Sequence, residues 1–258
     1  ELKMAEFHPL RSIKDVASPE WQALDKAAEN RAKQTSPAAV PSLNHASMKD
    51  FDEVYEPSDD TFLLIDGIQD DVSSNRSAYE EKFKMALEIG CGSGVPIVHL
   101  AKLLPSLTPM ATDINPAALE FAQRTAVENG ISNLQTIQCD LATDLLSDYQ
   151  HRIDALIFNP PYVPTPDDEV TGNGIEASWA GGERGRRVID RAIPQIAQLL
   201  SIPHGVAYMI TVDDNDPEEL ARIFATFHMH MEPLVRRRAR NEYLTVQKIT
   251  PMQKHITH

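Results

Sequence analysis

The chain has 258 residues, of which 42% are hydrophobic, enough for one domain with a sizeable core, alone or with an extension. Its formal net charge is −14 at pH 7, so direct binding to nucleic acid is not expected, because phosphate contacts require surplus Lys and Arg. No apolar run approaches the roughly 18 residues of a membrane span, and none near the start resembles a signal peptide. The two cysteines, Cys91 and Cys139, suit neither a disulfide framework nor a zinc site. A cytoplasmic or nuclear location is therefore expected.

Residues 1–47 contain Pro, Ser, Ala and Lys with few large apolar residues, and we interpret them as an N-terminal extension. Ser18-Pro19-Glu20 combines an N-cap, a proline at the first helical position and a first-turn acid, which predicts a short helix to about Lys33. Three apolar residues would share one face of this helix: Trp21, Leu24 and Ala28. We expect an arm that is partly helical, and otherwise disordered or loosely docked.

The remaining residues, 48–258, are expected to form the main domain. The predicted helices are Phe62–Ile68, Val95–Leu104, Asn115–Asn129, Gly185–Leu200 and Pro217–Phe227. The predicted strands are Met85–Ile89, Pro109–Thr112, Leu134–Cys139, Ile153–Phe158, Gly205–Val212, His228–Val235 and Tyr243–Ile249. Strands that alternate with helices predict an α/β fold with a doubly wound, mostly parallel seven-stranded sheet. The last two strands are close enough in sequence to form an antiparallel hairpin.

A glycine-rich turn, Glu88–Gly94, joins the first of these strands to the helix that follows. Glycine allows positive φ angles and a close approach of backbone to a ligand, so we expect Gly90 and Gly92 to contact a cofactor. A G-x-G-x-G run alone is a weak signal. Val95 stands where the dinucleotide-binding fingerprint would place its last glycine, which argues against NAD.

Acidic residues stand at or near the ends of the first three parallel strands: Glu88, Asp113 and Asp140. Each alone could be a helix N-cap, but three together make a poor pyrophosphate site. They suit a ligand with an ammonium and a sulfonium, such as S-adenosylmethionine. Asp113 would bind the ribose diol and Asp140 the adenine amino group, with Ile114 or Leu141 packed on the ring.

Upstream, the segment Tyr55–Thr61 places acids and a hydroxyl directly before a helix. Ser58 or Asp59 could simply cap that helix. The alternative is a lid over the methionine end of the cofactor, with Asp60 and Thr61 nearest to it.

The sequence Asn159-Pro160-Pro161-Tyr162 follows the apolar run 153–158 and suits methyl transfer to a planar nitrogen. The carboxamide oxygen of Asn159 and the backbone carbonyl of Pro160 can each accept one N–H of an amide or exocyclic amine. Two prolines fix the φ angles of the turn and remove competing backbone donors. Tyr162 offers a flat face on which the planar group can stack. An ordinary strand-to-loop turn is the plain alternative.

Taken together, YEPSDDTFLLID, LEIGCGSGV, TDINPAAL, CDL, FNPPYVPT and GIEASWAGG resemble the eukaryotic and archaeal HemK-type glutamine methyltransferases over about residues 48–250. NPPY is shared with adenine and cytosine amino-methyltransferases, whereas the first and last of these segments are specific to this branch. The resemblance implies a class I, Rossmann-like fold, no metal, no covalent intermediate, and methylation of the Gly-Gly-Gln glutamine of the class-1 translation release factor. It implies S-adenosylmethionine bound by Thr61, Glu88, Gly90, Asp113, Asp140 and Asn159, and a substrate amide held by Asn159, Pro160 and Tyr162.

Eukaryotic members of this family form heterodimers with a small zinc-binding activator, so the resemblance also implies a partner. In the sheet order typical of such enzymes, Leu134–Cys139 is an edge strand that a partner strand could cover. Nearby apolar residues would widen this surface: Leu103, Leu104, Leu107 and Met110. The alternative is that a helix of the same chain covers the edge.

N6-adenine methylation of DNA or RNA and lysine methylation are the competing activities, because the NPPY chemistry alone does not exclude them. The acidic charge argues against the first and the lack of an obvious base beside Asn159 against the second. Two segments depart from the family pattern. Residues 70–84 are longer and more polar than expected, and the basic run 236–240 is expected to be a solvated hairpin tip, or else a contact with the release factor or ribosomal RNA.

Overall fold

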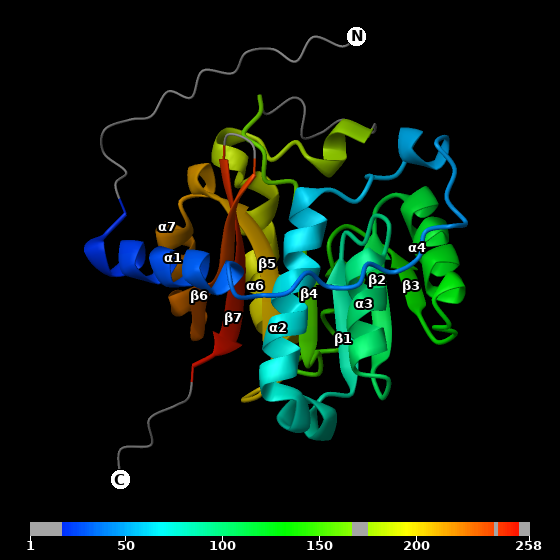
Figure 1. Cartoon of the computed structure of the whole chain (residues 1–258), viewed down its shortest axis with the longest axis horizontal. Helices are drawn as coiled ribbons and strands as arrows, with labels where there is room; N and C mark the ends of the chain where they lie inside the picture. Colours follow the sequence, from blue (N-terminus) through cyan, green and yellow to red (C-terminus); the bar gives the residue numbers. More distant parts are fainter. Residues whose placement is uncertain (1–16, 167–174, 240–241, 253–258) are drawn as a thin grey trace.

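Seven strands form one mixed sheet in a computed structural model that describes residues 17–166, 175–239 and 242–252 (Figure 1). The strands are β1 (Met85–Ile89), β2 (Thr108–Asp113), β3 (Gln135–Gln138), β4 (Ala155–Phe158), β5 (Val206–Val212), β6 (Met229–Ala239) and β7 (Glu242–Pro251). Their order is β3-β2-β1-β4-β5-β7-β6, and β7 alone runs in the direction opposite to the other six strands. The predicted α/β class, the mostly parallel sheet and the closing antiparallel pair are confirmed.

The order of the strands reverses between β1 and β4, which both lie at the centre of the sheet. In open α/β sheets, ligands bind beyond the carboxyl ends of the strands at such a reversal. The glycine-rich turn follows β1 and the NPPY turn follows β4. The topology therefore brings the two sequence motifs to the same end of the sheet.

Helices cover both faces of the sheet: α2 (Asp59–Lys82), α3 (Val95–Leu103), α4 (Pro116–Glu128), α6 (Arg187–Leu199) and α7 (Pro217–Thr226). One core cluster joins α2, α3 and α4 to the sheet, and a second joins α6 and α7 to the opposite face. Successive residues of β5 alternate between them, with Tyr208 in the first cluster and Met209 in the second. None of the described helices is long and apolar enough to cross a bilayer.

Helix α2 is much longer than the predicted Phe62–Ile68, because it also takes in most of the polar residues 70–84. The buried residues of α2 end at Val72, so its second half has a polar surface without an apolar stripe. Its polar contacts hold this part in place. Asp71 accepts hydrogen bonds from Tyr79 Oη at 2.8 Å and from Tyr208 Oη at 2.7 Å, and it pairs with Lys248 Nζ at 2.6 Å.

Residues 17–47, the described part of the N-terminal extension, pack on the domain, in contrast to the expected loosely docked arm. Helix α1 (Pro19–Ala32) begins at the predicted cap Ser18 and packs against β6. Trp21 is buried in the α6/α7 cluster and Ala32 packs against the other cluster, so α1 crosses the β6 edge of the sheet. Leu24 is exposed and does not share the buried face.

Residues 33–47 continue across the molecule from α1 to α4 and pass in front of α2 and α3 in Figure 1. Ala38 donates its backbone N–H to Asp66 of α2 at 2.7 Å, and Ser42 donates its backbone N–H to Asn129 at 2.9 Å. We call residues 33–47 the strap. Ala38, Leu43 and Ala46 of the strap also pack into two small apolar clusters. All of these contacts reach residues distant in sequence, so the composition of the strap alone did not predict its docking.

Arg236 was expected in a solvated hairpin tip, but it lies within β6 and is only 7% exposed. It pairs with Asp213 at 2.8 Å and with Asp25 and Glu29 of α1 at 3.7 and 3.6 Å. Its guanidinium also lies 4.4 Å from the ring centroid of Tyr243. The hairpin strands are therefore longer than predicted, while residues 240–241, between the two strands, lie outside the described part.

Strand β3 lies at the free end of the strand order, as the sequence predicted. Three of the four apolar residues expected to widen its surface do not do so, because Leu104, Leu107 and Met110 are at most 2% exposed, while the fourth, Leu103, is half-buried. The three buried residues belong to the two core clusters. The open surface at this edge is therefore the strand itself, whose residues are half-exposed or exposed.

Candidate active site

A cavity of about 790 Å³ lies beyond the carboxyl ends of β1, β2 and β4. Its volume is in the usual range for a small-molecule site. The residues predicted for the cofactor that line it are Thr61, Glu88, Gly90, Gly92, Asp113, Ile114, Asp140, Leu141 and Asn159. Asp60 is not among the lining residues. Of the predicted catalytic residues, Asn159 and Pro161 line the cavity, while Pro160 is buried and the half-buried Tyr162 is not among the lining residues.

The glycine-rich turn needs glycine at two places for different reasons. Gly90 has φ +62° and nothing within 4 Å of an added Cβ, so its backbone is open to the cavity. Gly94 has φ +69°, and a Cβ there would lie 2.7 Å from Cβ of Ala122 in α4. The first glycine gives a ligand access to the backbone and the second allows α3 and α4 to pack closely.

Two of the predicted acids are held by backbone N–H groups. Asp113 accepts from Gly92 at 3.0 Å and from Asn115 at 2.9 Å, while Glu88 accepts from Ile97 at 3.1 Å. Burial raises the pKa of Glu88 well above its ordinary value, and the nearby carboxylate of Asp113 adds to this effect. Burial also raises the pKa of Asp113. A cation beside these groups would favour their ionised forms, so the site suits a ligand with a positive charge.

The third acid has a partner that the sequence did not indicate. Asp140 forms an ion pair with Arg191 of α6, and both side chains line the cavity. Ile114 is 66% exposed and lies at the same end, next to Asp113. This end of the cavity therefore combines an apolar surface with a carboxylate, which suits a flat heterocycle bearing an amino group.

Asn159 has an unusual hydrogen-bonding state. Its Nδ2 donates to Asp60 Oδ2 at 3.0 Å, whereas its Oδ1 is buried and has no partner among the described residues. Asp60 Oδ2 also accepts from the hydroxyls of Tyr55 at 3.1 Å and Tyr162 at 3.3 Å. Burial, and then the charge of Asp60, raise the pKa of Tyr162 far above its ordinary range, so this hydroxyl stays protonated. A buried acceptor without a donor is costly in a folded protein. A ligand N–H would satisfy it.

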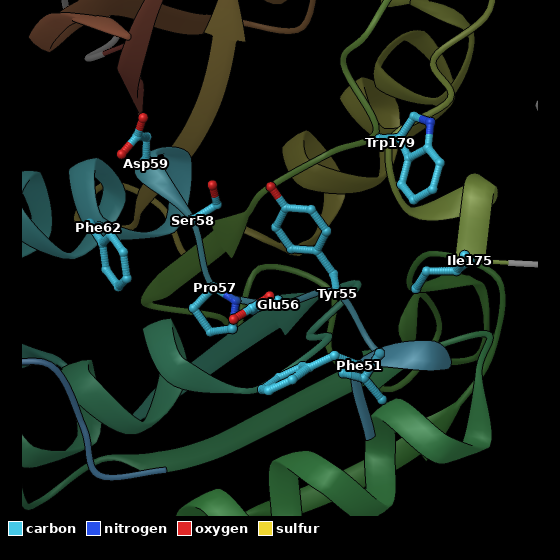
Figure 2. Close-up of a pocket in the computed structure, with 10 residues that line it drawn as sticks. Phe51, Tyr55, Glu56, Pro57, Ser58, Asp59, Phe62, Ile175 and Trp179 are labelled. Carbon is cyan, nitrogen blue, oxygen red and sulfur yellow. The ribbon is translucent and has the colours of Figure 1, made fainter. Parts of the chain in front are cut away.

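A second cavity of about 450 Å³ adjoins the first. The two share the lining residues Val54, Tyr55 and Ile175. Figure 2 shows Ile175 and Trp179 on one side of it and the segment that includes Phe62 on the other. A group bound in this second cavity would therefore lie beside the first cavity.

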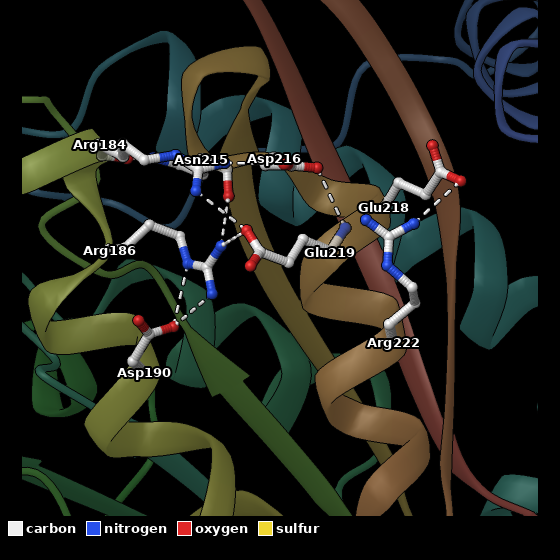
Figure 3. A network of polar contacts seen from close by, with 8 residues as sticks. All are labelled: Arg184, Arg186, Asp190, Asn215, Asp216, Glu218, Glu219 and Arg222. Atoms are coloured by element: carbon white, nitrogen blue, oxygen red, sulfur yellow. Dashed lines mark hydrogen bonds and ion pairs between the residues drawn. The ribbon is translucent and has the colours of Figure 1, made fainter. Parts of the chain in front are cut away.

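The NPPY turn is fixed by contacts with two other segments, one just after β5 and one just before α6. Asn215 is fully buried, and its Nδ2 donates to the backbone oxygens of Tyr162 and Arg184, both at 2.9 Å. Gly185 has φ +66°, and an added Cβ would lie 1.8 Å from the Tyr162 oxygen. Arg186 is 7% exposed and binds Asp190 and Glu219 at 2.8 Å, which ties this segment to α6 and α7 (Figure 3).

The sequence did not indicate the roles of Asn215, Arg186 or Arg191, because each acts through a partner far along the chain. The segment GIEASWAGG was noted only as part of the family pattern, and its last glycine, Gly182, lies just before this bracing network. Among the described residues, no group of three or more His, Cys, Asp or Glu side chains is placed to hold a metal ion.

Comparison with known proteins gives consistent results. Residues 72–176 match the family described as Methyltransferase small domain. The chain is 40% identical to Methyltransferase HEMK2 of Homo sapiens over 213 residues, which cover 82% of this chain and 96% of the human protein. It is 30% identical to the eRF1 methyltransferase catalytic subunit mtq2 of Schizosaccharomyces pombe, with 82% of this chain and 95% of the yeast protein covered.

Among solved structures, the chain resembles the Mtq2–Trm112 complex of E. cuniculi, described as responsible for methylation of the eRF1 translation termination factor. The TM-score is 0.55 at 27% identity, and the match covers 77% of this chain and 98% of that one. The fold, the open glycine turn, the buried acids and the unpaired Asn159 oxygen agree with these relationships. The chain therefore belongs to the HEMK2 family, a family of class I methyltransferases that use S-adenosylmethionine as methyl donor.

Proposed function

We propose that this protein methylates the side-chain amide nitrogen of the glutamine in the Gly-Gly-Gln motif of the class-1 translation release factor. Among curated relatives, the yeast protein is named for methylation of eRF1, and a relative 32% identical over 148 residues is named a putative protein N5-glutamine methyltransferase. The observation that carries the proposal is the buried, unpaired Oδ1 of Asn159 beside the cofactor cavity.

An amide nitrogen is a poor nucleophile because its lone pair is delocalised into the carbonyl. S-adenosylmethionine supplies a methyl carbon that a nitrogen can attack. Asn159 Oδ1 would accept one N–H of the glutamine and the carbonyl of Pro160 the other, which orients the nitrogen and stabilises its change of geometry. Tyr162, whose hydroxyl is held by Asp60, would place its ring against the planar amide.

The second cavity is the place where we expect the target loop to lie. It shares Tyr55 and Ile175 with the cofactor cavity, so a side chain could pass from one to the other. Trp179 and Phe62 are each 36% exposed there. A protein substrate would cover them on binding.

The S-adenosylmethionine carboxylate and ammonium end is expected near Glu88 and Thr61, and the adenosine end near Asp113, Ile114 and Asp140. Glu88→Gln is expected to weaken cofactor binding by at least about ten-fold, because a hydrogen bond to a charged group is replaced by a neutral one. Without cofactor, the same variant is expected to melt at a higher temperature than wild type at neutral pH. The raised pKa of the buried Glu88 side chain destabilises the folded state at every pH above the ordinary glutamate pKa.

The raised pKa of Glu88 makes both the stability of the folded state and the cofactor affinity depend on pH in a definite direction. Its folded-state pKa is raised, so the ionisation penalty grows as pH rises from the ordinary glutamate pKa to the raised value, and it is absent below the ordinary value. Binding of an ammonium favours ionisation, so cofactor affinity should rise with pH over the range of the raised pKa and then level off. Calorimetry on wild type and Glu88→Gln at several pH values measures this, and an unchanged pH profile in the variant would contradict the assignment.

We infer a protein partner from the family relationship and from the free edge of the sheet at β3. The protein is expected to form a heterodimer with a small zinc-binding methyltransferase activator through β3. Cys139 donates its backbone N–H to Asp113 at 3.2 Å, so the alternation along a parallel strand turns the backbone groups of Thr136 and Gln138 away from β2. These outward groups can pair with a strand of the activator.

Thr136→Pro is expected to abolish or strongly weaken the heterodimer, because proline removes the outward N–H of β3. Thr136→Val is the matched control. It also loses the hydroxyl that accepts from Gln123 at 3.3 Å, but it keeps the backbone donor. Co-purification and calorimetry compare the two variants. Equal binding by both would place the activator elsewhere on the molecule.

The proposed function is tested by incubating the chain with S-adenosylmethionine and the release factor, with and without the activator. Tandem mass spectrometry then locates any added methyl group. A methyl on the Gly-Gly-Gln glutamine that depends on the activator supports both the substrate and the partnership. A folded, cofactor-binding protein that leaves this glutamine unmodified would contradict the proposal, and lysine peptides and adenine-containing oligonucleotides would then be tested.

A further inference from the structure

The amide of Asn159 can in principle adopt two orientations, related by a half-turn about its terminal bond. One directs Oδ1 toward the substrate, and the other directs Nδ2 there. Only the first can accept an N–H of a glutamine amide. A residue that fixes one of these orientations therefore determines whether the NPPY turn can bind the substrate amide.

Asp60 is placed to make this choice. It lies at the start of α2, is 3% exposed, and does not line the cofactor cavity. Its Oδ1 accepts from Thr61, with the backbone N at 2.6 Å and the hydroxyl at 3.2 Å. Its Oδ2 accepts from Tyr55, Asn159 and Tyr162. These contacts hold the carboxylate in one position from both sides.

An ionised carboxylate only accepts hydrogen bonds, so it can face the Nδ2 of Asn159 but not its Oδ1. A flipped amide would set two acceptors against each other and would lose a charge-assisted hydrogen bond. With Nδ2 of Asn159 bound to Asp60, its Oδ1 is left buried and without a partner among the described residues. The structure leaves one acceptor unsatisfied on the side where the substrate is expected.

We propose that Asp60 is a positioning residue that locks the carboxamide of Asn159 with its oxygen toward the substrate nitrogen. The inference rests on the proposed function for the identity of the substrate, but the orientation itself does not depend on it. Asp60 would act through Asn159 rather than bind the cofactor.

Asp60→Asn tests the proposal with almost no change in shape. An amide at position 60 can present either a donor or an acceptor, so Asn159 loses its single preferred orientation. We expect turnover to fall about ten- to a hundred-fold, as for the loss of a charge-assisted hydrogen bond, with the dissociation constant for S-adenosylmethionine within about two-fold of wild type. Near-normal turnover, or a cofactor affinity that falls in proportion to turnover, would overturn it.

Asp66→Asn is the matched control for removing a buried carboxylate from the same helix. Asp66 is 4% exposed and accepts from Ala38 and Arg237, away from the cavity. Its variant is expected to lose thermal stability but not turnover per folded molecule. If it loses as much turnover as Asp60→Asn, the effect of Asp60 is general destabilisation and the proposal fails.

The double variant Asp60→Asn/Asn159→Ala separates positioning from a direct role. If Asp60 acts through Asn159, the double variant has the turnover of Asn159→Ala alone. If the two losses multiply, Asp60 acts by another route and the proposal is wrong.

An NMR measurement keeps this inference distinct from the substrate assignment. In the wild-type protein without substrate, the side-chain NH₂ signal of Asn159, identified by its absence in Asn159→Ala, should exchange slowly with solvent. Asp60→Asn should speed that exchange. An unprotected wild-type signal would refute the lock, whichever substrate is methylated. Protection together with an unmodified glutamine would refute only the proposed function.

Discussion

Asn159→Ala is expected to lower turnover by about a hundred-fold or more while the protein stays folded and still binds S-adenosylmethionine. The reason is that the variant removes one of two acceptors for the substrate amide, and removing one such transition-state partner typically costs a factor of a hundred to a thousand. The truncation also removes a buried, unpaired oxygen, so it relieves a local cost and should not unfold the chain. Single-turnover assays and calorimetry with the cofactor measure the two effects separately.

Asn44→Ala serves as the control for this measurement. Asn44 is an exposed residue of the strap whose Nδ2 lies 3.4 Å from Oε1 of Glu128 in α4, so its loss should leave turnover unchanged. If Asn159→Ala retains near-normal turnover with cofactor bound, the carboxamide does not hold the substrate. If the loss comes with failed cofactor binding, Asn159 serves the cofactor instead.

Gly185→Ala is expected to reduce both stability and activity, through a collision with the backbone of the NPPY turn. The added Cβ would meet the Tyr162 oxygen at 1.8 Å and Asn215 Nδ2 at 2.5 Å, so the turn or its brace must move. The positive φ and the overpacking together should cost about 2–5 kcal/mol of unfolding free energy. Because the displaced atoms belong to the catalytic turn, the folded fraction should also lose turnover.

Gly130→Ala is the matched control. Gly130 has φ +79° but nothing within 4 Å of an added Cβ, so the variant carries only the left-handed backbone cost of about 1–2 kcal/mol. Denaturant titration and turnover on both variants separate the two costs. Similar losses of activity in both would show that the clash at Gly185 is not what matters.

The features that the sequence predicted correctly are those carried by contiguous residues. The turn after β1 is identified by its glycines and the turn after β4 by its prolines, and both follow short apolar strands. The cap at Ser18 and the stop at Gly130 are equally local. Because parallel strands present their carboxyl ends at one edge, these motifs could be placed together without coordinates.

The features that the sequence missed depend on contacts between distant residues. Asp60 and Asn159 are 99 positions apart, and the amide orientation that they define has no pattern in the sequence. The docking of α1 depends on Trp21 and on the pairing of Asp25 with Arg236, residues that also suit an exposed helix and a solvated turn. Polar residues of this kind are ambiguous until their partners are known.

One outer strand of the sheet is covered and the other is open, and this difference limits how copies of the chain can join. Helix α1 crosses β6, while β3 stays open. A sheet with a single open edge can accept one added strand, after which growth stops. A sheet with two open edges can be extended from both sides, so identical molecules could link into a continuous array. Besides packing on the domain, helix α1 therefore blocks addition of a further strand at the β6 edge of the sheet.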